Sequence, residues 1–170
     1  PMTELFQKCS HMMVTLTKIP QPVVARVHGT ATAAGCQLVA QCDLAVAAED
    51  ATFATSGINI GLFCSTPMVA ETRNLPRKQA MEMLMTGEFI DAETARQYGL
   101  VNRVVPVQKL DEAVFELARC IAGKSPIAIT RGKELFYKQL GDDIEAAYDY
   151  AAEVITANMQ DVDARAGIGA

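Results

Sequence analysis

The sequence of 170 residues is short of basic residues and of long apolar runs. It has 15 Lys and Arg against 20 Asp and Glu, which gives a net charge of −5. Nucleic-acid binding requires a basic face, so this balance argues against a nucleic-acid partner. No apolar run approaches the roughly 20 residues that a helix needs to cross a bilayer, so we expect no membrane insertion.

Histidines and paired cysteines are scarce too. The two histidines, His11 and His28, have no partner at ligand spacing, so we expect no metal site. The five cysteines are odd in number and form no C-x-x-C pair, so we expect buried free thiols in a reducing compartment. No targeting segment is visible at the N-terminal end. We therefore predict the cytoplasm, with the mitochondrial matrix as the alternative if a segment upstream of Pro1 was lost.

Half of the residues are hydrophobic (50%) and 21% are charged, which is typical of one globular domain with a sizeable core. Apolar residues at helical spacing predict a helix over 4–18, with Thr3 as its cap. A β-branched run predicts a strand over 23–27, a helical pattern follows over 33–41, and a second apolar strand is expected over 44–48. A strand–helix–strand unit of this length implies two parallel strands.

The rest of the sequence is mostly helical, with short joints. A Gly- and Ser-rich loop is expected over 55–67, ending at Thr66–Pro67, where a helix should start. Further short strands are expected at 51–54 and 100–105. Helices are predicted over the remaining segments: 78–85, 91–99, 108–122, 125–140 and 142–159. We predict an α/β fold with a core over 1–105 and a helical C-terminal region over 106–170.

A run of small residues at 31–35 leads from the first strand into the helix over 33–41. Backbone N–H groups in a first helical turn have no intrahelical acceptor, and the helix dipole adds partial positive charge. Small side chains let a ligand come close to these groups. The arrangement suits a phosphate or the oxyanion of a thioester enolate, and a plain strand-to-helix turn would have the same pattern.

Several motifs follow one another along the chain. Residues 22–43 read PVVARVHGTATAAGCQLVAQCD, and residues 81–88 read MEMLMTGE. They are followed by GLV at 99–101 and VVP at 104–106. In combination these motifs resemble the signature of the enoyl-CoA hydratase/isomerase (crotonase) family. The segment GLFCSTP at 61–67 resembles the hydratase domain-containing branch of that family.

The resemblance implies a crotonase-like fold, built of βαβ units, and an acyl-CoA thioester substrate from fatty-acid metabolism. Family members hold the thioester carbonyl between two backbone N–H groups and stabilise the enolate; CoA is part of the substrate, so no separate cofactor is implied. The second N–H falls on Ala34, with Ala33, Gly35 and Cys64 as substrate-binding positions. The first lies in an N-terminal part of the family domain, about one third of it, which we expect this chain to lack.

The resemblance also implies assembly as a homotrimer or hexamer through the C-terminal helices. An apolar face in the last predicted helix suits such a role, although packing within one chain would explain it equally well. This face comprises Ile144, Ala147, Tyr148, Ala151 and Ile155.

Both glutamates that the family uses for hydration are replaced in this chain. Their positions fall on Gln37 and Gly57. Glutamine can position a water but cannot accept a proton, and glycine has no side chain, so hydration should be weak. Asp43, by the resemblance, has a structural place at a helix end. Four side chains are candidate replacements, and each is also explained by loop packing or hydrogen bonding: Thr55, Ser56, Asn59 and Cys64.

Three functions therefore stay open. The first is an enzyme that acts on acyl-CoA thioesters by stabilising an oxyanion. The second is a catalytically weak acyl-CoA-binding or oligomerising family member, which Gln37 and Gly57 favour as far as hydration is concerned. The third is a phosphate- or nucleotide-binding α/β domain, which is disfavoured because the sequence has neither G-x-G-x-x-G nor a Walker lysine.

Overall fold

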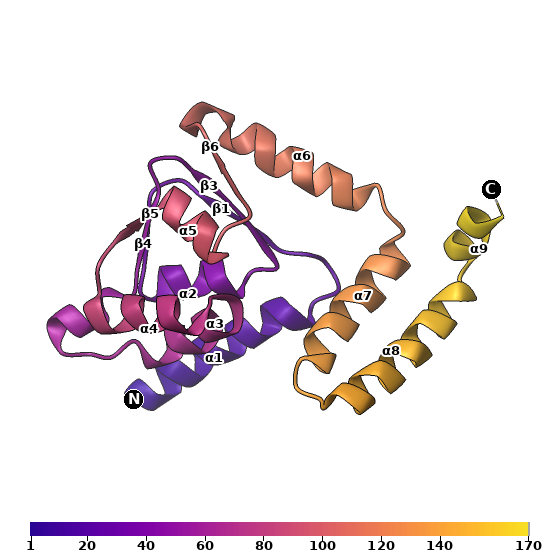
Figure 1. Ribbon diagram of the computed structural model, residues 1–170, viewed down its shortest axis with the longest axis horizontal. Coiled ribbons are helices and arrows are strands. Elements are labelled where there is room, and N and C mark those ends of the chain that lie inside the picture. The colour runs from indigo at the N-terminus through magenta and orange to yellow at the C-terminus, as the bar shows by residue number, and fades with distance from the viewer. Residues whose placement is uncertain (170) are drawn as a thin grey trace.

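The computed structural model describes residues 1–169 and shows an α/β core with a helical arm on one side (Figure 1). Three parallel strands form the first sheet, in the order β1-β3-β6: β1 (Val24–Val27), β3 (Leu44–Ala48) and β6 (Arg103–Val105). Helix α2 (Ala34–Gln41) lies between β1 and β3 in the chain. The predicted α/β class and the parallel strand–helix–strand unit are therefore confirmed.

A second small sheet leads into the segments that contain the predicted site residues. Strand β2 (Thr30–Thr32) pairs in parallel with β4 (Thr52–Ala54), which pairs antiparallel with β5 (Ile90–Asp91). Sequence analysis missed β2, because a strand of three residues is too short to show an alternating pattern. Since β2 and β4 are parallel, they end at the same edge of the sheet, and the residues that follow them meet there.

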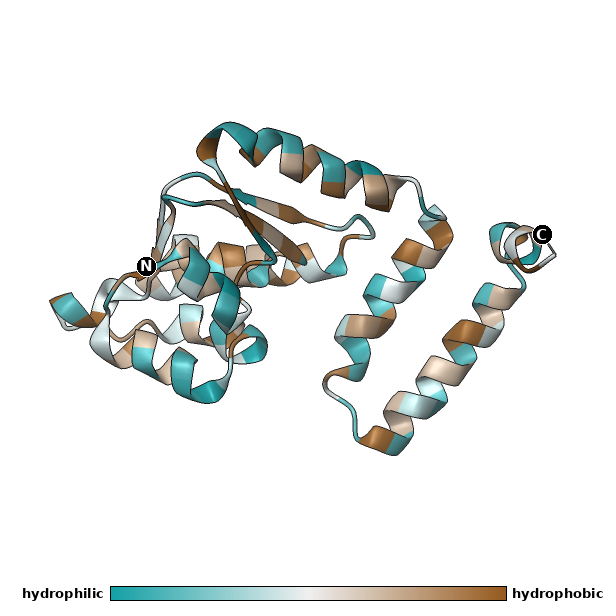
Figure 2. Cartoon of the chain, turned by 45° about the horizontal axis from the view of Figure 1, so that its top comes forward, coloured by the Kyte–Doolittle hydropathy of each residue, from teal (hydrophilic) through white to brown (hydrophobic). Residues whose placement is uncertain are grey.

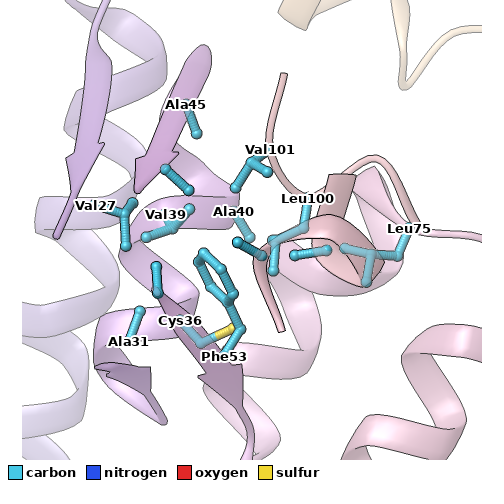
Figure 3. Packing of buried hydrophobic residues seen from close by; sticks show 14 of the residues in the cluster. Val27, Ala31, Cys36, Val39, Ala40, Ala45, Phe53, Leu75, Leu100 and Val101 are labelled. Carbon is cyan, nitrogen blue, oxygen red and sulfur yellow. The ribbon is translucent and has the colours of Figure 1, made fainter. Parts of the chain in front are cut away.

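Small and medium-sized side chains fill the main core. Phe53 of β4 is fully buried, and Cys36 and Val39 of α2 lie beside it (Figure 3). Leu75 and Leu100 belong to the same cluster. Three further helices surround it: α3 (Ser65–Asn74), α4 (Arg77–Thr86) and α5 (Ala92–Tyr98). This packing fixes α2 against β4, and so fixes the direction of its first turn.

Two helices begin differently from the sequence prediction. Helix α1 (Met2–Lys18) has Pro1 in the N-cap position, so Thr3 lies inside the helix and the prediction that it caps the helix was wrong. Helix α3 begins at Ser65 with Cys64 in the cap position. Pro67 is then the third helical residue, which proline tolerates because the first N–H groups of a helix have no acceptor.

The later elements follow the prediction more closely. The strand expected over 100–105 is shorter, because Leu100 and Val101 are buried in the core before β6 starts. Aspartate side chains cap two of the later helices: Asp91 Oδ1 accepts from Thr94 N at 2.7 Å, and Asp143 Oδ1 accepts from Ala146 N at 3.0 Å. The C-terminal helices are α6 (Leu110–Ala122), α7 (Pro126–Gln139), α8 (Ile144–Met159) and the unpredicted α9 (Val162–Ile168).

The C-terminal helices divide into two parts. Helix α6 packs on the first sheet, where Leu110 and Ala113 join Val46 and Ala48 in a second buried cluster. Helices α7 and α8 project from the core as an antiparallel pair (Figure 1). Figure 2 shows hydrophobic residues along α8 at the outer edge of this arm.

One buried ion pair fastens the arm to the core. Lys133 Nζ of α7 lies 2.7 Å from Asp43 Oδ2, just after α2. The same ammonium donates to the carbonyls of Leu16 and Gln21, and Tyr137 donates its hydroxyl to Asp43 Oδ1 at 2.7 Å. Burial raises the pKa of the Tyr137 hydroxyl, and its hydrogen bond to Asp43 raises that pKa further. Asp43 therefore has the structural place at a helix end that was expected of it.

The cysteines are less uniformly buried than predicted. All five are free thiols, but only Cys36 and Cys64 are buried. Cys9 and Cys42 are half-buried, and Cys120 is exposed on α6. The prediction of buried thiols was therefore wrong for Cys120, which lies near the C-terminal end of α6.

Candidate functional site

The first turn of α2 forms the centre of the site. Its first intrahelical hydrogen bond runs from Gln37 N to Ala33 O, 2.9 Å, so the N–H groups of Ala34 and Gly35 precede the helical ladder. Both residues are exposed. The helix dipole adds partial positive charge at this end. The turn can therefore hold an anionic or strongly polarised oxygen.

A strained backbone at Ala33 turns the chain from β2 into α2. Its φ is 49° and its ψ is −114°, and among residues 1–169 it is the one non-glycine residue with positive φ. Such a conformation costs a residue with a Cβ on the order of 1–3 kcal/mol. Ala34 is the first helical residue, so alanine fits there without strain. The glycine-like position is therefore Ala33, one residue before the predicted N–H donor.

The segment after β4 lies beside this turn. Ala33 N donates to Ala54 O at 3.0 Å, and the hydroxyls of Thr32 and Ser56 are 2.8 Å apart. Ser56 opens a short 3-10 helix, Ser56–Ile60, which contains Gly57. The fold thus places the 3-10 helix that contains Gly57 beside the turn that leads into α2, the helix that carries Gln37.

Gly57 has no room for a side chain. A Cβ placed there would lie 2.6 Å from the carbonyl oxygen of Leu62 and 2.8 Å from Cys64 Sγ. Both distances are shorter than any normal carbon contact. A glutamate at this position would therefore have to displace the segment from Leu62 to Cys64.

Three buried polar side chains have atoms without a hydrogen-bond partner in the described part of the chain. They are Oε1 of Gln37, Oγ1 of Thr55 and both carboxylate oxygens of Glu71. Gln37 is 4% exposed, and Thr55 and Glu71 are fully buried. Buried polar atoms without partners are rare in folded proteins, and they concentrate at catalytic or strained sites.

Glu71 is a residue that sequence analysis missed. Burial raises its pKa to about 7, while the adjacent Cys36 thiol opposes that rise. The signal was available: Glu71 lies four residues after Pro67 and four before Leu75, both of which are buried on the same face of α3. A carboxylate at core spacing in an apolar helix face is a candidate functional residue.

The other candidate replacements have defined places. Asn59 donates its side-chain amide to Gly87 O at 3.2 Å, which holds the loop to the end of α4. Ser56 is bonded to Thr32, as described above. Cys64 is 8% exposed and adjoins Gly57.

Within residues 1–169, no group of three His, Cys, Asp or Glu side chains is placed to hold a metal ion. No helix in this range combines the length and the apolar character needed to cross a membrane.

Parallel β-strands that end beside an exposed helix N-terminus, with a helical region after them, have the same arrangement in solved enoyl-CoA hydratases, so the fold is crotonase-like. The chain matches the enoyl-CoA hydratase/isomerase family over residues 2–170, and it belongs to that family. The resemblance seen in the sequence, including the hydratase domain-containing branch, is thereby confirmed.

Individual relatives are similar over nearly the whole chain. "Enoyl-CoA hydratase domain-containing protein 3, mitochondrial" of Rattus norvegicus is 49% identical over 168 residues, which cover 99% of this chain and 56% of the relative. The crystal structure of an enoyl-CoA hydratase of Mycobacterium smegmatis has a TM-score of 0.97 and 53% identity, covering 98% of this chain and 65% of that one. The human domain-containing protein 3 has a TM-score of 0.95 and 48% identity, covering 98% and 66%. The chain thus spans about half the length of the curated relatives it matches.

Proposed function

We propose that this chain binds acyl-CoA thioesters and polarises the thioester carbonyl at the N-terminus of α2. The observation that carries the proposal is the exposed first turn of α2, with the N–H groups of Ala34 and Gly35 ahead of the helical ladder. Relatives named as enoyl-CoA hydratases support the substrate class. CoA enters as part of the substrate, so the proposal requires no separate cofactor. The role in fatty-acid metabolism is part of the same proposal.

The chemistry of the turn is that of an oxyanion site. When a proton leaves C2 of an acyl thioester, negative charge develops on the carbonyl oxygen. N–H groups that are fixed before the reaction stabilise that charge, and each such donor contributes about 10²–10³ in turnover. Ala33 and Gly35 flank the donor at Ala34. Neither has a side chain larger than a methyl group, so the thioester carbonyl of the substrate has room to approach.

Water addition by this chain should be slow. Gln37 cannot accept a proton, and Gly57 offers no side chain and no room for one. General acid–base groups contribute about 10²–10⁴ to rate. The second candidate function, a catalytically weak acyl-CoA-binding or oligomerising family member, is favoured by this same observation.

Self-assembly, as a homotrimer or hexamer, is also proposed. The apolar face predicted on α8 is exposed in the single chain at Ile144 (73%), Tyr148 (72%) and Ile155 (57%), although α8 packs against α7. Light scattering after size-exclusion chromatography should give a mass above that of one chain, and Tyr148→Glu should lower it.

We also propose a compartment for this chain. Curated relatives of 49% and 48% identity carry the word mitochondrial in their names. This favours the mitochondrial matrix, the alternative location, over the cytoplasm for this chain.

Calorimetry with butyryl-CoA tests the proposed function. Ala34→Pro removes the donor at a helix position that tolerates proline. It is best made with Ala33→Gly, because the residue before a proline is restricted. Against Ala33→Gly alone, the double variant should bind butyryl-CoA up to about tenfold more weakly, the contribution of one hydrogen bond. Val162→Pro, at the first residue of α9, is the matched control and should leave binding unchanged. Equal affinity of Ala33→Gly and the double variant would remove this turn from the site.

A further inference from the structure

The Cys64 thiol lies where a side chain at position 57 would begin. A Cβ on Gly57 would be 2.8 Å from Cys64 Sγ, so the sulfur fills the space beside the glycine. Cys64 is the cap residue of α3 and is 8% exposed. Position 57 is where the family carries its second hydration glutamate. The site therefore has a thiol next to the place from which that carboxylate would project.

A second thiol and a buried carboxyl lie behind Cys64. Burial raises the pKa of Cys36, and the charges of Glu71 and Cys64 raise it further, which places the three groups in one cluster. Cys36 belongs to α2, whereas Cys64 and Glu71 belong to α3 and its cap. Glu71 is fully buried, and within residues 1–169 neither of its oxygens has a hydrogen-bond partner. Such a carboxyl costs stability, and buried polar groups without partners concentrate at functional sites, so the cluster marks this part of the molecule as a candidate site.

We propose that Cys64 is the proton-transfer residue of this site. The inference rests on the proposed function, because it needs the enolate of a bound acyl-CoA. An ordinary thiol is mostly protonated at neutral pH and can therefore donate a proton.

The proposed step is balanced without any reagent besides water. The S–H bond of Cys64 breaks, a C–H bond forms at C2 of the enolate, and the thioester carbonyl is restored. The thiolate then takes a proton from water. In the reverse direction the thiolate removes a proton from C2, and the N–H groups of Ala34 and Gly35 hold the enolate oxygen. In D2O the two directions together replace hydrogen by deuterium at C2 of a saturated acyl-CoA.

Deuterium incorporation into butyryl-CoA, followed by mass spectrometry between pH 6 and 9, tests the inference on the full chain. Cys64→Ser should lower the exchange rate by about 100-fold or more, because a hydroxyl is a far weaker acid. The affinity for butyryl-CoA should stay within about threefold. Cys120→Ser, an exposed thiol on α6, is the matched control and should exchange like the unmodified chain.

The possible failures are distinguishable. Exchange by Cys64→Ser at the unmodified rate, or no exchange by an unmodified chain that binds butyryl-CoA, would overturn the inference and leave the proposed binding intact. An unmodified chain that does not bind butyryl-CoA would overturn the proposed function, and this inference with it. If Cys64→Ser does not fold, methyl methanethiosulfonate can block Cys64 reversibly in the unmodified chain. Exchange should then stop on blocking and return with dithiothreitol, whereas exchange that continues in the blocked chain contradicts the inference.

Discussion

Ala33 donates its backbone N–H to the carbonyl oxygen of Ala54 over 3.0 Å, and this bond joins the two halves of the site. It holds Ala33 at a φ of 49°, a conformation that glycine adopts freely and alanine does not. The adjacent Ala34 has an ordinary helical conformation. Two neighbouring alanines therefore respond to the same substitution in opposite directions.

Ala33→Gly should stabilise the chain by about 1 kcal/mol, because relief of the strained φ exceeds the extra backbone entropy that glycine loses on folding. Ala34→Gly should destabilise it by about 0.5–1 kcal/mol, the usual effect of glycine within a helix. Urea unfolding followed by circular dichroism measures both. If Ala33→Gly proved destabilising, the positive φ would not exist in solution.

Glu71 should make the stability of the chain depend on pH. Its pKa in the folded state is about 7, above its ordinary value of 4.5, because the side chain is buried. The native state then holds more protons than the unfolded state between these values, so stability falls as pH rises from 4.5 to 7. The loss is about 3 kcal/mol.

The variant Glu71→Gln isolates this effect. It should lack the decline between pH 4.5 and 7, while Glu82→Gln, on the surface of α4, should keep it. Urea midpoints at half-unit pH steps give the comparison. Parallel pH curves for the unmodified chain and Glu71→Gln would show that Glu71 titrates as an exposed carboxyl does.

Two lysine–carboxylate pairs of equal length should differ in their contribution to stability. Lys133 Nζ to Asp43 Oδ2 and Lys109 Nζ to Glu112 Oε2 both measure 2.7 Å. The side chains of the first pair are 7% and 15% exposed, whereas those of the second are 63% and 65% exposed. Lys133→Met should cost about 3–5 kcal/mol, because it leaves a buried carboxylate without its cation. Lys109→Met should cost less than about 1 kcal/mol. Free energies of unfolding are measured in urea. Equal values for the two variants would refute the anchoring role of Lys133.

Restoring the family glutamates should not restore hydration. The loss of the enoyl-thioester absorbance measures the hydration of crotonyl-CoA. The unmodified chain should hydrate it about 10²–10⁴-fold more slowly than a chain with an acid–base pair would. Gln37→Glu alone supplies only one carboxylate of that pair. Gly57→Glu should destabilise the chain by about 1–3 kcal/mol, because its Cβ would clash with Leu62 and Cys64.

A glycine with open space around it serves as the comparison for Gly57. No atom lies within 4 Å of a Cβ added at Gly35, so Gly35→Ala should be tolerated whereas Gly57→Ala should not. A well-folded Gly57→Glu chain with fast hydration would contradict this reading of the loop.

The sequence predicted the parts of the fold that rest on local patterns. The β-branched run of β1 and the helical spacing of α2 are local signals, and both elements were located correctly. Strand β2 and helix α9 were not, because they are short and depend on tertiary partners. The motifs correctly identified the family. The site positions that they gave, Ala34, Gln37 and Gly57, stay predictions.

The remaining features depend on contacts between distant segments. The strained φ of Ala33 accompanies its hydrogen bond to Ala54, 21 positions later in the sequence. The residue type alone, alanine, gives no sign of this conformation. The lack of room at Gly57 comes from the way Leu62 and Cys64 fold back upon it. Glu71 was visible in the sequence as a carboxylate at core spacing, but its neighbour Cys36 was not predictable from that spacing.

The most direct test of the central claim is the carbon-13 resonance of the thioester carbonyl in butyryl-CoA labelled at C1. A carbonyl that accepts hydrogen bonds from the first turn of α2 loses electron density at carbon, so its resonance should move downfield on binding. The shift should be smaller with the Ala33→Gly/Ala34→Pro variant than with Ala33→Gly. A carbonyl resonance that stays at its free position while butyryl-CoA is bound would contradict the account.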